Sequence, residues 1–587
     1  MTKKNQLDLP IDKAEIKRHS LAHIMAAAVK TIWPKVKLAI GPAIDNGFYY
    51  DIDFGDKKVG EEDLKNIEKK MKHLIKQNLK FESRELEIDK AIDKEKKEGQ
   101  IYKVELLEDL KKEGEKKVSY YKVGEFEDLC RGPHVKSSGQ LENDTFKLIK
   151  LAGAYWRGDE KNKMLTRIYG VAFRSEIELK NYLEMLAEAA KRDHKKLGRE
   201  LDLFTFHSEA PGSAFWHPKG MVIWNELEHL GKKLREKYGS VEIQTPILAK
   251  GMLWKKSGHW EHYEDSMFHF MVNNESYVIK PMDCPFNILL YQEKQRSYKE
   301  LPIRYSEIGR VFRNEKSGEL NGLFRVQHVT QDDAHIFTRE DQVEDEIQAL
   351  LKMVKEYYAI FNIEPKFFFA NRPDDYLGKA SNWDKAEKAL QNALRKEKIK
   401  YGLKEKDGAF YGPKIDINID DALGRSWQLA TIQLDFQLPE RFCLEYINRD
   451  GQKEIPVIIH AAIFGSLERF IGILTEHYAG AFPVWLSPVQ VKFISVGEKH
   501  INCAQELAQE FKKQGIRTEL DESDETVGNK IRKAVQEKVP YILVIGDKEI
   551  KSAKLCVRDR GQQKTREIKK DKFIKEVKEK INKRFLE

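Results

Sequence analysis

A segment near the middle of the chain, residues 313–335, has the residue types that bind phosphates. It holds two arginines, a glutamate and two adjacent carboxylates: Arg313, Arg325, Glu315, Asp332 and Asp333. Each guanidinium can bind two phosphate oxygens at once, so two of them facing one cleft suit a polyphosphate. A surface hairpin with ordinary ion pairs is the alternative that these residues alone leave open.

The pattern around this segment predicts a β-hairpin. Tyr305–Phe312 is expected to form one strand and Leu323–Thr330 the return strand, with a turn at Ser317–Glu319. This arrangement would bring Arg313 and Arg325 close together on paired strands.

A second group of reactive side chains lies near the N-terminus. His19 and His23 are four residues apart on an expected helix, so both point to one face. Cys130 and His134 form a further pair with the same spacing. By spacing alone, two such pairs predict a zinc site.

Two more segments join the first in resembling one family. Cys284 lies in KPMDCP, His335 ends TQDDAH, and His460 lies in IPVIIHAAIFGSLERF. Together with residues 313–335 they resemble class II aminoacyl-tRNA synthetases, in the form carried by threonyl-tRNA synthetases. The similarity runs from about Ile11 to the C-terminus. It implies an α+β multidomain fold: an antiparallel β-sheet catalytic core flanked by helices, preceded by an α+β editing domain and followed by an α/β anticodon-binding domain.

The resemblance implies one Zn²⁺ per subunit, bound by Cys284, His335 and His460. The spacing of these residues in the sequence could not by itself identify them as metal ligands. A zinc with three protein ligands keeps a position open for substrate. A site that must bind a hydroxyl rejects an analogue without it by roughly 10⁴ to 10⁵, which would separate threonine from valine. Asp333 resembles the carboxylate that receives the threonine hydroxyl. The other residues expected at the amino acid are Gln331, Tyr411, Gln433 and Ser466.

The same resemblance implies adenylate chemistry with ATP and Mg²⁺. Arg313 resembles the family's arginine that contacts the α-phosphate, and Glu315 resembles its neighbour, which lies over the adenine. Arg469 resembles the arginine that contacts the γ-phosphate, and Arg325 completes the expected catalytic set. Threonine carboxylate would attack the α-phosphorus, and the 3′-terminal ribose of threonine tRNA would then take the acyl group. Positioning and charge stabilisation suffice for this reaction.

The N-terminal residues resemble the editing site of threonyl-tRNA synthetases, a metal-free hydrolytic pocket. The similar domain of alanyl-tRNA synthetase resembles a metal site, so a metal remains the alternative. Serine differs from threonine by one methyl, worth about 1–3 kcal/mol, and zinc cannot improve that discrimination. Hydrolysis of seryl-tRNA would need a separate pocket. Its expected residues are His19, His23, Lys103, Asp128, Cys130 and His134.

Several positions depart from the family pattern. Asp283, Phe286–Asn287, Val329 and Ala461 replace the usual residues, which leaves details of adenine stacking and of the zinc surroundings open. In the anticodon-binding domain Glu549 and Arg558 resemble base-reading residues, whereas Asp524 stands where an asparagine is common.

The expected domains are 1–174 for editing, 175–199 as a linker helix, 200–487 for catalysis and 488–587 for anticodon binding. Helices are expected at Asp12–Trp33, Ser175–Arg199, Met221–Tyr238 and Asp571–Phe585, and strands at Val241–Thr245, Val489–Val496 and Tyr541–Ile545. The region near Val241–Pro246 is expected to build a homodimer interface. The small ubiquitin-like domain that often begins this family is not expected here, because only about a dozen residues precede the first helix.

Composition sets outer limits. Hydrophobic residues make up 41% and charged residues 34% of the 587, as in soluble globular proteins. Five cysteines without repeated spacing favour a reducing compartment, and neither a signal peptide nor a membrane span is evident, so a cytoplasmic location is expected. Residues 551–587 hold 14 Lys and Arg against 6 Asp and Glu, a surplus equal to the net charge of +8 of the whole chain. This basic tail suits a tRNA-binding appendage, although a solvated amphipathic helix would also account for it.

Two other functions remain open from the sequence. A non-catalytic paralogue could retain the fold and tRNA binding, and a related enzyme could act on serine. The arginines and the Cys/His/His set favour the threonine enzyme, with threonine tRNA, L-threonine and ATP as its partners.

Overall fold

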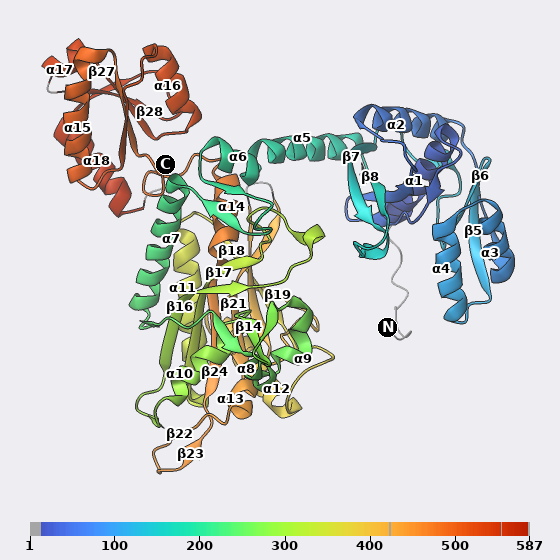
Figure 1. Ribbon diagram of the computed structural model, residues 1–587, viewed down its shortest axis with the longest axis horizontal. Helices are drawn as coiled ribbons and strands as arrows, with labels where there is room; N and C mark the ends of the chain where they lie inside the picture. The colour runs from blue at the N-terminus through green and yellow to red at the C-terminus, as the bar shows by residue number, and fades with distance from the viewer. Residues whose placement is uncertain (1–12, 422–423, 553, 585–587) are drawn as a thin grey trace. The chain divides into compact units, whose positions relative to one another are not determined.

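The computed structural model describes residues 13–421, 424–552 and 554–584. The chain divides into two compact units, Met1–Ala187 and Glu188–Glu587 (Figure 1). No helix in these described stretches is long and apolar enough to cross a membrane.

The first unit packs a buried helix against an antiparallel sheet. Helix α1 (Lys13–Ile32) is buried continuously from Ser20 to Val29, which explains its run of alanines and aliphatic residues. A second, three-stranded sheet packs against two helices rich in charged residues, within residues 88–112. The sheet of α1 has the order β1–β3–β8–β7, with β2 paired to β3. The elements are β1 (Lys37–Leu38), β2 (Ala43–Ile44), β3 (Gly47–Asp53), α2 (Glu61–Lys76), β4 (Phe81–Glu87), α3 (Ile88–Lys97), α4 (Ile101–Lys112), β5 (Lys117–Val123), β6 (Phe126–Leu129), β7 (Phe146–Tyr155) and β8 (Met164–Ala172).

The second unit is built on an eight-stranded sheet with the order β11–β16–β17–β24–β21–β20–β18–β19. All neighbours are antiparallel except β11 with β16 and β18 with β19. Its strands are β11 (Val241–Glu242), β16 (Ile303–Phe312), β17 (His328–Thr338), β18 (Pro365–Ala370), β19 (Tyr401–Lys404), β20 (Lys414–Asp420), β21 (Ser426–Asp435) and β24 (Val457–Ser466). The main helices are α7 (Pro218–Lys237), α10 (Cys284–Gln292), α11 (Val343–Ala359), α12 (Ala380–Lys396) and α14 (Leu467–His477). A smaller sheet joins β12 (Leu248–Lys250), β14 (Glu275–Ile279) and β13 (His269–Val272) beside α8 (Gly251–Ser257).

The C-terminal part of this unit has its own mixed sheet, in the order β26–β25–β27–β28–β29. Strand β25 is parallel to both β26 and β27, whereas β28 and β29 run antiparallel, which confirms the expected mixed α/β pattern. Its elements are β25 (Val491–Ser495), α15 (Ile501–Lys513), β26 (Thr518–Asp521), α16 (Val527–Gln536), β27 (Tyr541–Ile545), α17 (Asp547–Lys551), β28 (Lys554–Asp559), β29 (Arg566–Lys569) and α18 (Lys570–Asn582).

Two expected elements differ from the structure. The single helix at 175–199 is two helices, α5 (Glu176–Arg192) and α6 (His194–Glu200). The Asp193 carboxylate accepts from the Lys195 and Lys196 amides, so a new N-cap restarts the helix there. The strand expected at 241–245 covers only Val241–Glu242. The first residue of the helix expected at Asp12–Trp33 lies outside the described residues.

The hairpin prediction is wrong in its second strand. Strand β17 starts at His328 rather than Leu323 and continues to Thr338. Residues 313–327, called the motif 2 loop below, therefore lie between the strands, and Arg325 belongs to this loop. Buried Leu323 and Phe324 account for the error, because they pack as a loop anchor rather than along a sheet.

Candidate active sites

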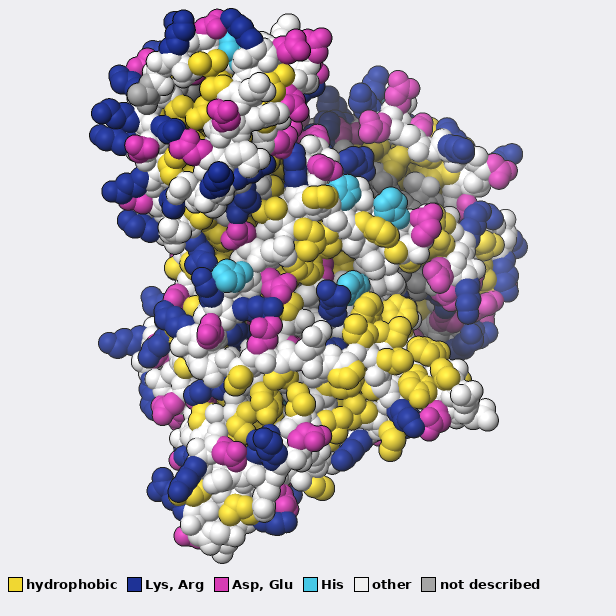
Figure 2. All heavy atoms as spheres, turned by 60° about the vertical axis from the view of Figure 1, so that its left-hand side comes forward, with side chains coloured by type: hydrophobic (Ala, Val, Ile, Leu, Met, Phe, Trp, Pro, Cys, Tyr) yellow, Lys and Arg dark blue, Asp and Glu magenta, His cyan; other side chains and the backbone are white. Residues whose placement is uncertain are grey.

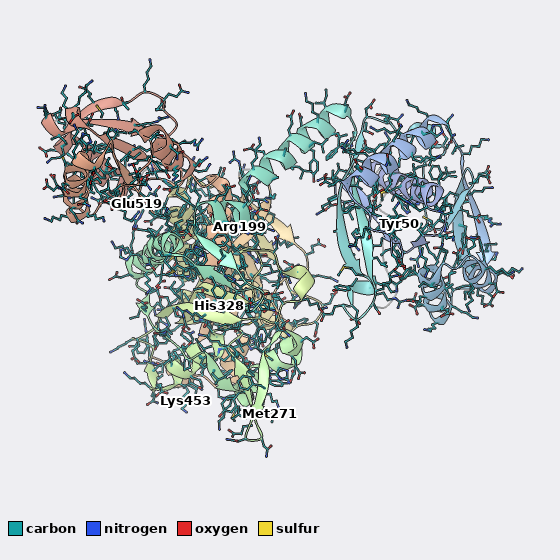
Figure 3. All side chains as sticks on the ribbon, turned by 45° about the horizontal axis from the view of Figure 1, so that its top comes forward. Tyr50, Arg199, Met271, His328, Lys453 and Glu519 are labelled. Atoms are coloured by element: carbon teal, nitrogen blue, oxygen red, sulfur yellow. The ribbon has the colours of Figure 1, made fainter. Side chains whose placement is uncertain are left out.

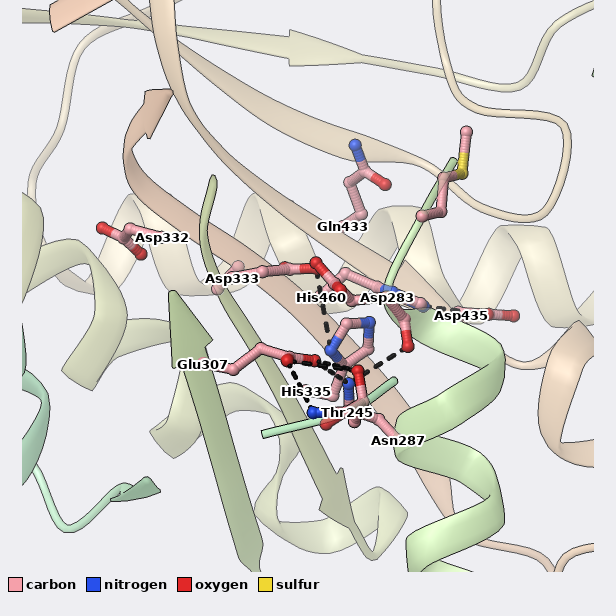
Figure 4. A network of polar contacts seen from close by, with 12 residues as sticks. Thr245, Asp283, Asn287, Glu307, Asp332, Asp333, His335, Gln433, Asp435 and His460 are labelled. Carbon is pink, nitrogen blue, oxygen red and sulfur yellow. Dashed lines mark hydrogen bonds and ion pairs between the residues drawn. The ribbon is translucent and has the colours of Figure 1, made fainter. Parts of the chain in front are cut away.

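Strands β17, β24 and β21 bring three predicted site residues side by side. His335 on β17 is the register partner of His460 on β24, and His460 is the partner of Gln433 on β21. Because side chains alternate along a strand, Gln331 and Asp333 share the face of His335. Figure 4 shows His335, His460, Asp333 and Gln433 around one centre.

Cys284, at the start of α10, completes a metal-ligand set with the two histidines. One donor atom from each of Cys284, His335 and His460 lies within 4.8 Å of the others, and all three residues are buried. Nε2 of His335 and Nδ1 of His460 are buried without a hydrogen-bond partner among the described residues, which a metal ion would resolve. Burial lowers the pKa of His335 well below its usual value and keeps its imidazole neutral, the form that binds metals. The donor set fits Zn²⁺.

Asp435, on β21, and Tyr411, in the loop before β20, support this centre. The Asp435 carboxylate lies 2.9 Å from Nε2 of His460, which leaves Nδ1 of that ring as the free ligand atom. Its other oxygen accepts from the amides of Gln437 and Leu438, which fixes its position. The Tyr411 hydroxyl donates to the Gln433 side chain. Asp435 had no sequence signal, since it lies 25 residues from His460 and its role depends on strand pairing.

The adjacent carboxylates Asp332 and Asp333 have separate environments because they point to opposite faces of β17. Asp333 faces the histidines, with its carboxylate 3.9 Å from Nδ1 of His335, and burial raises its pKa well above the usual value. Asp332 pairs instead with buried Arg235 of α7 and accepts from the Ile463 and Phe464 amides. Asp332 therefore forms a structural ion pair with Arg235, and of the two carboxylates only that of Asp333 faces the candidate metal site.

A polar network that includes Thr245, Asp283 and Glu307 lies beside the two histidines (Figure 4). Lys280 forms ion pairs with Asp283 at 2.6 Å and Glu307 at 3.6 Å and donates to the Thr245 hydroxyl at 2.9 Å. Glu307 accepts from the amide and hydroxyl of Thr245. Asp283, one of the departures from the family pattern, therefore meets a buried cation instead of standing alone.

The other departures also have defined places. Ala461 is buried in the core, and Phe286 packs edge-on against Trp254. Val329 pairs with Val311 between β17 and β16, and the neighbouring His328 stacks on Phe312 with ring centroids 4.7 Å apart.

The phosphate-binding candidates gather at the other end of these strands. Arg469, on α14, donates from Nε to the Phe324 carbonyl (3.0 Å) and from an Nη to the Gln428 carbonyl (3.3 Å). Burial lowers its pKa, with Arg313 and Arg325 adding like-charge repulsion. An anion between these guanidiniums would relieve that repulsion.

The remaining residues of this group stabilise the motif 2 loop or the start of α14. Arg325 forms ion pairs with Glu315 (2.8 Å) and Glu319 across the motif 2 loop rather than lying on a strand. Ser466 caps α14 by accepting from the Arg469 amide at 3.1 Å. Gln331 is the register partner of Ser466, at a bulge between β17 and β24.

All six predicted editing residues meet in the first unit. Cys130 Sγ lies 3.2 Å from Nε2 of His19 and 3.1 Å from Nε2 of His134. Lys103 forms a buried ion pair with Asp128 at 2.8 Å. Five of the six line one cavity of about 350 Å³, His134 being the exception: His19, His23, Lys103, Asp128 and Cys130.

Tyr50 joins this site without any prior sequence signal. Its hydroxyl donates to Asp128 and accepts from Lys103 at 3.1 Å (Tyr50 is labelled in Figure 3). The site also includes Ser20, whose hydroxyl lies 3.2 Å from Nδ1 of His134. Tyr50 could be recognised only from the pairing of β3, because tyrosine in a strand is commonly a core residue.

Burial sets the protonation of the editing pocket. It lowers the pKa of His23 to about 4 and that of His134 to about 2, so both rings are neutral at pH 7. It raises the pKa of Cys130 to about 11, which keeps a protonated and weakly nucleophilic thiol. Burial would also raise the pKa of Asp128, but Lys103 outweighs it and keeps the carboxylate ionised. His19, Cys130 and His134 could together hold a metal ion by distance.

The two predicted anticodon residues lie on neighbouring elements of the C-terminal sheet. Glu549 caps α17 by accepting from the Gly546 amide at 3.1 Å. Arg558 on β28 donates to the Gln562 carbonyl at 3.1 Å. Asp524 is exposed in the segment after β26.

Comparison with known proteins gives a consistent assignment across the chain. The tRNA synthetase class II core domain (G, H, P, S and T) matches residues 268–478, the anticodon binding domain residues 490–580, and the threonyl and alanyl tRNA synthetase second additional domain residues 118–169. Threonine–tRNA ligase of Carboxydothermus hydrogenoformans is 52% identical over 547 residues, covering 93% of this chain and 86% of its own length. The ligase of Clostridium tetani is 49% identical and covers 97% and 88%. A structure of the RNA binding domain of threonyl-tRNA synthetase from Cryptosporidium parvum matches with a TM-score of 0.64 and 39% identity, over 66% of this chain and 98% of that one.

Proposed function

Because the chain belongs to the threonine–tRNA ligase family of class II aminoacyl-tRNA synthetases, we propose roles in that reaction for the residues described above. The family resemblance seen in the sequence is confirmed, and the activity is ATP-dependent ligation of L-threonine to its tRNA, with an editing domain before the core. The observation that carries the residue assignment is the convergence of Cys284, His335 and His460 on the strand face that holds Asp333.

Adenylate formation uses Arg313 and Arg469. Arg313 contacts the α-phosphate that threonine carboxylate attacks, and Arg469 contacts the γ-phosphate of the departing pyrophosphate. Their mutual repulsion in the ligand-free protein supports this assignment, because bound phosphate compensates it. Glu315 holds Arg325 across the motif 2 loop and lies over the adenine. ATP is the expected substrate and Mg²⁺ the expected cofactor, and the cation would neutralise charge that builds up on the phosphates.

Cys284, His335 and His460 would hold one Zn²⁺ per subunit. When bound, the zinc would coordinate the amine and hydroxyl of threonine and thereby exclude valine. Asp435 orients the His460 ring, and Asp333 accepts a hydrogen bond from the threonine hydroxyl. Gln331, Tyr411, Gln433 and Ser466 contact the amino acid.

In the first unit the neutral histidines and Lys103 carry out hydrolysis of seryl-tRNA. His19 and His23 orient a water molecule, and Lys103 stabilises negative charge that develops on the ester oxygen. The pKa of about 11 for Cys130 supports attack by water rather than by the thiolate.

The remaining proposals concern partners, place and domain limits. Editing occupies 1–174, the linker 175–199, catalysis 200–487 and anticodon binding 488–587, with Glu549 and Arg558 reading anticodon bases. All five cysteines are free thiols, which supports a cytoplasmic location.

We propose that the protein is a homodimer through a face around β11, β12 and α8. This face exposes Val241 (59%), Leu248 (47%), Met252 (72%) and, on β13, Met271 (64%). Figure 2 shows hydrophobic side chains gathered on the lower half of its view, and Figure 3 labels Met271 at an edge of the second unit. Apolar area of this kind is typical of a protein interface. Sedimentation should give a dimer for the wild type, and a monomer-shifted equilibrium for Met252→Glu; a monomeric wild type would refute the proposal.

Threonine-dependent pyrophosphate exchange tests the assignment of the catalytic residues. Arg313→Ala and Arg469→Ala should each slow exchange by at least about a hundredfold, since each removes a charge-assisted contact to phosphate. Cys284→Ala should lose zinc in metal analysis. Near-normal exchange in either arginine variant, or undiminished zinc in the cysteine variant, would reject the corresponding role.

A further inference from the structure

A buried histidine at the start of α6 connects two parts of the catalytic domain. His194 is 1% exposed and lies within the second unit, just after the helix break at Asp193. Its Nδ1 lies 2.7 Å from the carboxylate of Glu476, near the end of α14. Its Nε2 accepts the amide hydrogen of Leu323, in the motif 2 loop, at 3.0 Å.

These contacts fix the tautomer of His194. The Leu323 amide can only donate, so Nε2 carries no proton, and Nδ1 must donate to Glu476. The same carboxylate oxygen of Glu476 also accepts from the His194 amide at 3.0 Å, and Arg425 binds the other oxygen. The orientation of the imidazole is therefore determined on both sides.

The contact with Leu323 leads directly to Arg469. The next residue, Phe324, accepts from Nε of Arg469 through its carbonyl, and its ring lies tilted against the His194 ring with centroids 4.1 Å apart. Arg469 and Glu476 lie seven residues apart on α14, two turns or about 10 Å along one face. Helix α14 therefore holds the motif 2 loop at two points, directly through Arg469 and indirectly through Glu476 and His194.

The motif 2 loop passes very close to the His194 ring. Gly322 has a φ of +52°, and a Cβ atom there would lie 2.3 Å from Nε2 of His194. A side chain at Gly322 would therefore push the loop away from the imidazole.

We propose that His194 is a positioning residue for adenylate formation: it anchors the Leu323–Phe324 peptide so that Arg469 and the motif 2 loop are held ready for the ATP phosphates. The inference rests on the proposed role of Arg469. It assigns to the linker segment a function in nucleotide binding beyond the connection of two domains. His194 acts through Phe324 and Arg469 and does not itself touch substrate.

Two substitutions in the full-length protein test separately the contacts made by the two ring nitrogens of His194. In His194→Asn the amide nitrogen replaces Nδ1 and keeps a donor for Glu476, but nothing reaches the Leu323 amide. In His194→Gln the amide oxygen replaces Nε2 and keeps that acceptor. In pyrophosphate exchange, H194N should raise the KM for ATP about tenfold, as expected for one lost buried acceptor, with the KM for threonine and the zinc content unchanged. H194Q should stay within about threefold of the wild type.

Gly322→Ala approaches the same contact from the loop and should also raise the KM for ATP, which provides a test if H194N does not fold. Lys196→Ala, on the exposed side of α6, is the matched control. Equal KM values for ATP in H194N, G322A and the wild type would overturn the inference, as would a parallel rise in both KM values. If the wild type exchanges normally and Arg469→Ala does too, the role of Arg469 fails instead, and the inference fails with it.

Discussion

Burial determines the protonation of the editing histidines, and this has a consequence for stability. His23 has a pKa of about 4 in the folded chain, against 6.5 for an exposed histidine. Between these values the unfolded state binds more protons, so the stabilisation present above pH 6.5 is lost as pH falls toward 4. At pH 5 the loss from His23 alone should be about 2 kcal/mol.

Calorimetry of the wild type and His23→Gln at pH 7 and pH 5 measures this effect. The glutamine does not titrate, so the variant should lose about 2 kcal/mol less of its unfolding free energy over this interval. His73→Gln, at an exposed position on α2 of the same unit, should behave like the wild type. An identical pH dependence in wild type and H23Q would show that the pKa of His23 is the same in the folded and the unfolded protein.

Single residues were predictable from the sequence only where spacing or family pattern identified them. The spacing of His19 and His23 indicated a shared helix face, and the structure places both in one cavity. Cys284, His335 and His460 depended entirely on the resemblance. Asp435, Tyr50 and His194 gave no signal, because their importance depends on which strand or helix packs beside them.

Among the secondary-structure elements, β17 shows how one strand separates two adjacent carboxylates. Asp332 neutralises Arg235, which is only 5% exposed, whereas Asp333 faces the proposed zinc site. Asp332→Ala would leave a buried arginine unpaired and should destabilise the second unit by about 3–5 kcal/mol. Urea denaturation measures this loss.

Two variants control for this prediction. Asp333→Ala should cost far less stability but should abolish threonine-dependent exchange, since its carboxylate faces the site. Asp341→Ala, which removes an exposed ion pair with Arg339, should change stability by at most about 1 kcal/mol. A similar loss of stability in D332A and D341A would mean that Arg235 does not need Asp332.

Elements followed the sequence where periodicity was strong and departed from it where local contacts prevailed. Strands β25 and β27 and helices α1 and α18 formed near their expected places. The expected strand beginning at Leu323 became a loop, because Leu323 and Phe324 are anchored by His194 and α14 rather than by a neighbouring strand. The expected linker helix divided at Asp193, whose capping side chain competes with a continuous helix.

At the scale of the whole molecule, the order of the domains was predictable because each is matched by its own family. The two compact units divide at Ala187, within α5. The boundary proposed at residue 174 marks the expected end of the editing domain in the sequence, and it does not coincide with the division between the compact units. In the part of the chain that the structure describes, the cavity of the proposed editing residues is lined by the first unit alone, and Cys284, His335 and His460 all lie in the second.

This separation predicts that the two activities can be uncoupled in the full-length protein. Replacing His19 and His23 by alanine should leave threonine-dependent pyrophosphate exchange within about twofold of the wild type, because adenylate chemistry occurs entirely in the second unit. The same variant should accumulate seryl-tRNA, since the ligase site can reject serine only by the binding energy of one methyl, about 1–3 kcal/mol. Charging threonine tRNA with serine, using wild type and variant in parallel, measures this. Accumulation by the wild type as well would show that the first unit does not edit. Loss of threonine activation in the variant would show that the two units are energetically coupled.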